Sequence, residues 1–119
     1  MRLVTGVPND DLTRVPRAIE AVEAAGYDVV STQENRHDPF LPLAVAAVSS
    51  KRVELATSIS IAFARSPMVF ANLGWDLQKA PRGRFVLGLG SQVKGHNERR
   101  FSVPWSAPAP RMKECVQAI

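Results

Sequence analysis

Two kinds of hydrophobic periodicity alternate along this chain. Short runs rich in β-branched and apolar residues are typical of strands. Each is followed by a segment whose apolar residues recur every three or four positions, as in an amphipathic helix. The strand-like runs begin near Leu3, Tyr27, Val53 and Phe85, so each strand–helix unit takes about 25–30 residues. This alternation predicts parallel strands joined by crossover helices, and therefore an α/β fold.

Turn and cap signals set the expected bounds of these elements. Ser66 followed by Pro67 predicts a helix start, because a hydroxyl can cap the helix and proline suits its first position. The apolar run at the end of the fourth unit predicts a strand covered on both faces, and a long polar loop is expected after it. The expected strands are Arg2–Val7, Tyr27–Thr32, Val53–Ile59 and Phe85–Gly90, and the expected helices are Thr13–Ala25, Pro42–Ser50, Pro67–Arg82 and Met112–Ile119.

Two architectures can be built from such units. A doubly wound sheet can close with four strands, whereas a (β/α)8 barrel needs about 250 residues. The chain has 119 residues, which is enough for one domain but for only half of a barrel.

Composition excludes several classes of function. The net charge is +4, but the basic residues are scattered among acidic ones and no aromatic residues interleave with them, so we expect no nucleic-acid partner. The longest apolar stretch, Phe40–Val48, is interrupted by Pro42 and is far shorter than the about 20 residues that span a bilayer. The first residues also lack the apolar core of a secretory signal. We therefore expect a cytoplasmic protein that does not act at a membrane.

Polar residues cluster after two of the predicted strands. Glu34, His37 and Asp38 follow the second strand, at the edge where parallel α/β folds place ligands, although such a cluster is more often a solvent-exposed hydrogen-bonding group. The two histidines and the single cysteine match no zinc spacing, so we expect no metal.

The turn after the fourth strand, GLGSQV, begins like a dinucleotide-binding fingerprint. Its third glycine position holds Val93, and the polar segment that follows predicts a loop instead of a helix, so the residues depart from a dinucleotide-binding site in both respects. Glycines at the end of a strand otherwise permit close packing or the close approach of a ligand.

Read together, these segments resemble the luciferase-like monooxygenase superfamily, and within it the oxidoreductases that use the deazaflavin coenzyme F-420. The resemblance covers nearly the whole chain. It rests on GYDVV with Glu34, HDPFLPLA, LATSIS, ARSPM, WDLQ, GRFVLGLGSQV, ERRF, and PWS with the later RM.

The resemblance implies a luciferase-like (β/α)8 barrel and hydride transfer between the deazaflavin and an organic substrate. It implies a non-proline cis peptide bond between Ser58 and Ile59 that backs the cofactor ring. The residues expected to bind the cofactor are Thr32, Ser58, Ile59, Gly90, Ser91 and Gln92, and the candidate catalytic residues are Glu34 and His37.

The sequence departs from the family in two respects. Related dehydrogenases carry an acidic residue where this chain has Val93, so no general acid or base is carried over from them. The family also runs to more than twice this length. The chain, residues 1–119, is thus expected to be the N-terminal half of the barrel, about four βα units truncated at the C-terminal end, and to be inactive alone. Two halves could pair as a homodimer. The alternatives are an FMN-dependent monooxygenase of the same superfamily and a non-catalytic half-barrel fragment.

Overall fold

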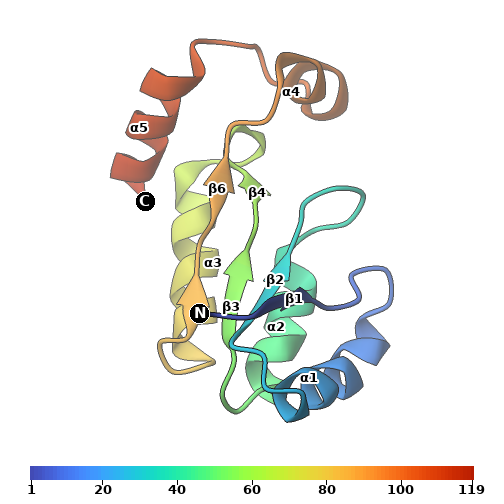
Figure 1. Cartoon of the computed structure of the whole chain (residues 1–119). Coiled ribbons are helices and arrows are strands. Elements are labelled where there is room, and N and C mark those ends of the chain that lie inside the picture. The colour runs from blue at the N-terminus through green and yellow to red at the C-terminus, as the bar shows by residue number, and fades with distance from the viewer.

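The computed structural model describes all 119 residues. Its strands form two sheets, one of four strands and one of two, and the paired strands are parallel in both. The main sheet has the order β1-β2-β3-β5, and β4 pairs with β6 as a continuation of β3 and β5 (Figure 1). Strand order thus follows chain order, as in a barrel, whereas a doubly wound sheet reverses direction at a switch point. The strands are β1 (Val4–Gly6), β2 (Val29–Thr32), β3 (Glu54–Thr57), β4 (Ser60–Ile61), β5 (Phe85–Val86) and β6 (Leu89–Gly90).

Helices follow the strands as the periodicity predicted. Three of them pack on one face of the main sheet, and α5 lies beside α3 (Figure 1). None of the helices is long and apolar enough to cross a bilayer. The α-helices are α1 (Val15–Ala24), α2 (Phe40–Ser49), α3 (Pro67–Lys79), α4 (Lys94–Phe101) and α5 (Pro108–Ala118), and the short 3-10 helices are η1 (Leu12–Arg14) and η2 (Ala62–Ala64).

Side-chain caps explain where two of these helices begin. The Ser66 hydroxyl accepts a hydrogen bond from the Val69 amide at 3.4 Å, which confirms the predicted start of α3. α2 begins two residues earlier than predicted, because the Asp38 carboxylate accepts from the Phe40 amide at 2.8 Å. Asp38 therefore serves the loop after β2 and the first turn of α2 together.

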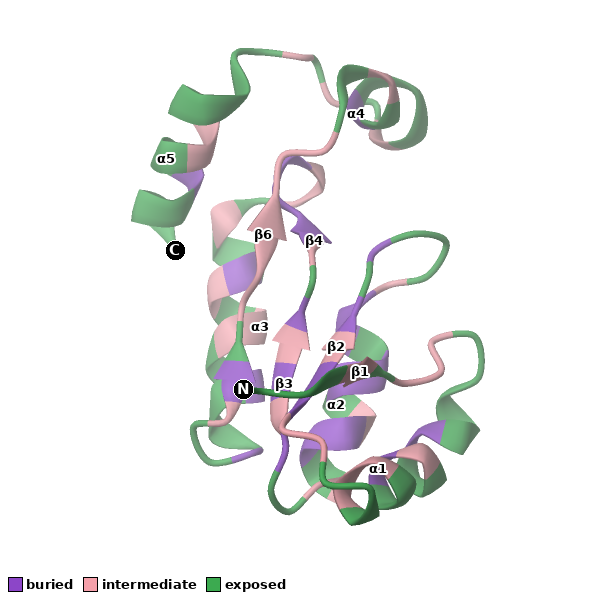
Figure 2. Ribbon diagram, viewed as in Figure 1, coloured by how far each residue is buried: buried purple, intermediate pink, exposed green.

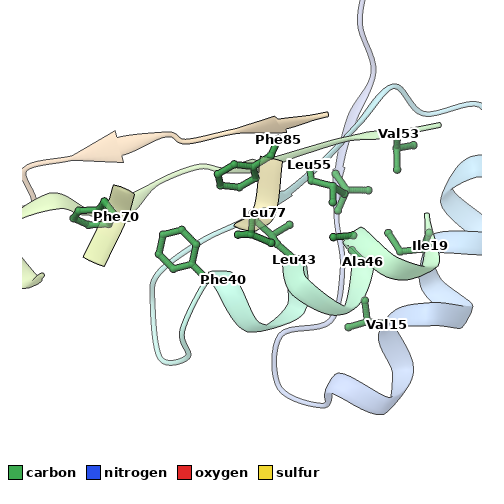
Figure 3. Packing of buried hydrophobic residues seen from close by; sticks show 12 residues of the cluster. Val15, Ile19, Phe40, Leu43, Ala46, Val53, Leu55, Phe70, Leu77 and Phe85 are labelled. Carbon is green, nitrogen blue, oxygen red and sulfur yellow. The ribbon is translucent and has the colours of Figure 1, made fainter. Parts of the chain in front are cut away.

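The hydrophobic core lies between the main sheet and helices α1, α2 and α3. The strand register aligns Val30 with Leu55 and Leu55 with Phe85, and all three side chains are buried toward the helices. Figure 3 shows Leu55 and Phe85 packing with residues of the three helices, and Figure 2 shows that α4 and α5 are mostly exposed. The core cluster comprises Val15, Ile19, Val30, Phe40, Leu43, Ala46, Ala47, Val53, Leu55, Phe70, Leu77 and Phe85.

The fourth unit differs most from the prediction. The expected strand Phe85–Gly90 is divided into β5 and β6, and it is not covered on both faces, since Val86 is 45% exposed. The expected polar loop contains α4, and the last helix begins at Pro108 instead of Met112. Because α4 is almost entirely polar, it has no apolar periodicity from which sequence could predict it.

Glu23 anchors the end of α1 to the turn before β3. Its carboxylate accepts backbone N–H bonds from Lys51 at 2.9 Å, from Arg52 at 2.6 Å and from Val53 at 3.0 Å. Burial by itself raises the pKa of this carboxyl, but the three hydrogen bonds outweigh it and lower the pKa below its usual value. The charged form is therefore more stable in the folded chain than in the unfolded chain.

The substitution Glu23→Gln tests this anchor through pH. A carboxyl with a lowered folded pKa stabilises the fold above its unfolded pKa, and that contribution is lost as pH falls through the folded pKa. We expect Glu23→Gln to be less stable than the wild type at neutral pH, and the difference to shrink below about pH 4. Urea unfolding at several pH values measures it. Glu20→Gln, on the exposed face of the same helix, is the matched control; an equal, pH-independent loss in both variants contradicts the anchor.

Candidate functional site

Three loops meet where the parallel strands end at their carboxyl side. Backbone hydrogen bonds join them: the Ser58 amide donates to the Thr32 carbonyl at 2.7 Å, and the Glu34 amide donates to the Ile59 carbonyl at 3.2 Å. The Ser60 amide donates to the Gly88 carbonyl at 2.8 Å. In Figure 1 the loop after β2 lies beside the point where β3 ends and β4 begins. The structure therefore joins the loop after β2 to the segment Ser58–Ser60, and joins that segment to Gly88.

The third predicted strand is interrupted at this edge. β3 ends at Thr57 and β4 begins at Ser60, so the predicted strand Val53–Ile59 is two strands with a break between them. The peptide bond between Ser58 and Ile59 is cis, as the resemblance implied. Ser58 is exposed and Ile59 half-buried, so both can reach a molecule placed at this edge.

Two glycines let the β5–β6 segment lie close to the β3–β4 segment. The Thr57 hydroxyl donates to the Gly88 carbonyl and accepts from the Gly88 amide, both at 2.8 Å. A Cβ on Gly88 would lie 1.9 Å from the Thr57 carbonyl oxygen, and a Cβ on Gly90 would lie 2.8 Å from the Ile59 side chain. The predicted close packing at these glycines is confirmed.

The carboxylate of Glu34 holds the segment that follows the cis bond. It is only 5% exposed, and its Oε2 accepts from the Ser60 hydroxyl at 3.0 Å and from the Ile61 amide at 2.7 Å. The Arg65 guanidinium donates to both carboxylate oxygens, at 2.9 and 2.8 Å. Both oxygens are thus engaged within the protein, and this arrangement suits a residue that fixes the loop.

Arg65 links this carboxylate to the loop after β2. Its second terminal nitrogen donates to Asp38 at 2.8 Å, and its guanidinium lies 5.5 Å from the ring centre of Phe40 and 5.9 Å from that of Phe70. Burial by itself lowers the pKa of Arg65, but Glu34 and then Asp38 outweigh it and raise the pKa above its usual value. The guanidinium therefore stays charged and paired at every physiological pH.

The remaining predicted residues differ in their surroundings. The Thr32 hydroxyl is buried and donates to the Pro39 carbonyl at 2.8 Å, so it shapes the loop after β2. His37 is exposed at the tip of that loop. Ser91 and Gln92 are half-buried beyond β6, and Gln92 has a positive φ of 55°. The catalytic roles assigned to Glu34 and His37 stay predictions.

Sequence reasoning missed two residues of this site. Arg65 stands in a segment that carried the resemblance, but nothing in its sequence spacing indicates a bond to Glu34, which lies 31 positions earlier. Asn97 lies in a segment interpreted as solvated, yet its side-chain amide donates to the Ser91 carbonyl at 2.9 Å. A buried polar residue in a polar segment carries no periodic signal.

The sheet face opposite the core carries a row of small side chains next to these loops. The register places Gly6, Ser31, Ala56 and Val86 in one row across β1, β2, β3 and β5, and the buried residues of the core alternate with them. Three of the four side chains are small. These small side chains leave room for a flat ring beside the segments that follow the strands.

The Glu34–Arg65 pair predicts a large effect on stability. Arg65→Ala leaves the buried Glu34 carboxylate without its cation, and breaking a buried pair in this way costs about 3 kcal/mol or more. The control is Arg2→Ala, which breaks a pair with Glu54 whose side chains are 61% and 31% exposed, and which we expect to cost less than about 1 kcal/mol. Urea unfolding measures the free energy of unfolding of both variants. Equal losses would show that the Glu34–Arg65 pair stabilises the fold no more than the exposed Arg2–Glu54 pair does.

The packing of Gly88 predicts a second difference. Gly88→Ala forces a Cβ against the Thr57 carbonyl, so we expect a loss of about 1–3 kcal/mol or more. Gly74→Ala is the matched control, because a Cβ there meets nothing within 4 Å and alanine favours the helix by about 1 kcal/mol. Thermal unfolding should therefore move in opposite directions for the two variants. A neutral Gly88→Ala contradicts the close approach of the strands.

Comparison with known proteins places the chain in a family. The family model described as luciferase-like monooxygenase matches residues 2–119. An uncharacterised protein of Mycobacterium tuberculosis is 50% identical over 119 residues, which are 100% of this chain and 35% of that protein. A second protein of Mycobacterium tuberculosis, provisionally named a coenzyme F-420-dependent oxidoreductase, is 37% identical over 85% of this chain and 29% of its own length. The 5,10-methylenetetrahydromethanopterin reductase of Methanolobus tindarius is 25% identical over 95% of this chain and 35% of its own length.

Solved structures share the fold. A monooxygenase from Streptomyces bottropensis matches with a TM-score of 0.85 and 22% identity, over 99% of this chain and 41% of that chain. The coenzyme F-420-dependent tetrahydromethanopterin reductase of Methanopyrus kandleri matches with a TM-score of 0.83 and 20% identity, over 98% and 38%. The oxygenating constituent of 3,6-diketocamphane monooxygenase from Pseudomonas putida, solved in complex with FMN, matches with a TM-score of 0.79 and 16% identity, over 98% and 38%.

The chain spans about a third of the length of the curated relatives that it matches. Its parallel α/β fold matches part of the luciferase-like barrels, and its relatives include both F-420-dependent and FMN-binding proteins. The family model covers all but the first residue. The chain belongs to the luciferase-like monooxygenase family.

Proposed function

We propose that this chain supplies the ring-binding edge of an oxidoreductase that transfers a hydride between coenzyme F-420 and a small organic substrate. The observation that carries the proposal is the junction of three loops at the carboxyl ends of the strands. It holds the Ser58–Ile59 cis bond against the Gly88–Gly90 segment, beside a row of small side chains. Barrel enzymes build their sites at this edge.

Each group at this edge has a role that its contacts support. The exposed Ser58 and half-buried Ile59 would lie against the ring, and the turn Gly90–Gln92 would offer backbone groups to its rim. When bound, the cofactor supplies the hydride chemistry, and the protein supplies position and electrostatics. Glu34 is a positioning residue in this proposal, because both of its oxygens already accept hydrogen bonds from the protein.

Coenzyme F-420 is favoured over FMN by the level of similarity. The relative named for coenzyme F-420 is 37% identical to this chain, whereas the FMN complex is only 16% identical and shares the fold alone. A deazaflavin does not readily activate oxygen, so we infer a reductase or dehydrogenase. His37, exposed on the neighbouring loop, is the remaining candidate for proton transfer to the substrate.

Cofactor titration of the full-length protein tests this proposal. We expect saturable fluorescence quenching with coenzyme F-420 and binding of FMN at least about tenfold weaker, a difference of about 1.4 kcal/mol. Gly90→Val should weaken binding because its side chain would collide with Ile59, and Gly74→Ala is the control that leaves the site untouched.

The other outcomes distinguish the coenzyme F-420 proposal from the two alternatives. Tighter binding of FMN would replace the proposal with the FMN-dependent alternative. Binding of neither cofactor, by protein whose unfolding is cooperative, would contradict a ring-binding role for this edge and favour a non-catalytic module.

A further inference from the structure

The turn between β6 and α4 contains an uncommon backbone conformation and no helix cap to stabilise it. The strand ends at Gly90, and α4 begins at Lys94 without a side-chain cap on its first turn. Between them, Gln92 has a φ of 55°, a conformation that L-residues adopt infrequently. Such a turn persists only where the surrounding structure holds it.

Asn97 provides that support from within α4. Its Nδ2 donates to the Ser91 carbonyl at 2.9 Å and to the Val93 carbonyl at 3.1 Å, so one amide bridges both sides of Gln92. Its own backbone carbonyl accepts from the Val103 amide at 2.9 Å. Asn97 thus ties the start of the helix to the segment that follows it.

The burial of Asn97 is unusual for its surroundings. It is 0% exposed, whereas its helical neighbours Glu98, Arg99 and Arg100 are exposed. Its Oδ1 has no hydrogen-bond partner, and an unpaired buried acceptor costs free energy. An apolar residue of the same shape would avoid that cost but would leave the Ser91 carbonyl without its donor, so the unpaired oxygen does not explain an amide at this position. The two bonds from Nδ2 do account for it.

We propose that Asn97 is a positioning residue that sets the Gly90–Val93 turn for binding the cofactor ring. Asn97 acts through the turn and does not touch the ring itself. The inference rests on the proposed function, because the turn matters to catalysis only where a ring binds there. It adds a residue of α4 to a site whose other members come from the loops after β2, β3 and β6.

The substitution Asn97→Leu in the full-length protein separates positioning from stability. Leucine has the same number of side-chain heavy atoms but donates no hydrogen bond. It removes the donor of the Ser91 carbonyl, which lowers stability, and it also removes the unpaired buried Oδ1, which raises stability, so the two effects oppose each other. We expect an unchanged unfolding midpoint and about tenfold weaker binding of coenzyme F-420, from the loss of two hydrogen bonds. Asn72→Leu, on an exposed position of α3, is the matched control and should bind as the wild type does.

Hydrogen exchange without cofactor gives a readout that does not depend on the proposed function. Amides of residues 91–97 should exchange about tenfold faster in Asn97→Leu, while those of α1 stay unchanged. Asn97→Val, which also donates no hydrogen bond but has a smaller side chain, is the second variant if leucine does not fit the site, and we expect the same change in exchange at residues 91–97.

Three results overturn the proposal. They are unchanged exchange at residues 91–97, wild-type affinity despite faster exchange, or parallel losses of affinity and global stability in both variants. If the wild type itself binds neither coenzyme F-420 nor FMN, the proposed function fails. The cofactor role of Asn97 then fails with it, and the exchange data alone decide whether Asn97 holds the turn.

Discussion

The buried ion pair between Glu34 and Arg65 is the interaction on which the candidate site depends. Glu34 comes from the loop after β2, but its carboxylate binds the Ser60 hydroxyl and the Ile61 amide, which belong to the next strand. Arg65 neutralises that carboxylate and reaches Asp38, which caps α2. A charge buried in this way is tolerated only with a partner and hydrogen bonds. The pair therefore couples two βα units at the edge that is proposed to bind the cofactor ring.

Small residues complete the edge by letting backbones approach one another. Gly88 lies against Thr57, and Gly90 lies against Ile59. The β5–β6 segment therefore runs beside the β3–β4 segment with no side chain from either glycine between them. The main core cluster lies on the helix-covered face, while the opposite face carries the row from Gly6 to Val86. The division between a packed face and a low, open face comes from strand alternation, because successive side chains point to opposite sides.

Periodicity predicted the order of strands and helices, and Ser66 followed by Pro67 predicted the start of α3. Prediction from periodicity failed where the local sequence has no repeating hydrophobic pattern. The break at Ser58–Ile59 was expected only from resemblance, and the polar helix α4 was interpreted as a loop. The predicted site residues do gather at one edge, because parallel strands end there together. Arg65 and Asn97 were missed, since their partners are set by tertiary contacts.

The crystal structure of the full-length protein with coenzyme F-420 tests the central claim most directly. The claim is that the edge held by Glu34 and Arg65 receives the cofactor ring. It predicts ring atoms in van der Waals contact with Ile59 and with the Gly90–Gln92 turn, with the Glu34–Arg65 pair intact. A ring bound elsewhere on the molecule, with that turn and Ile59 free of contact, would contradict it.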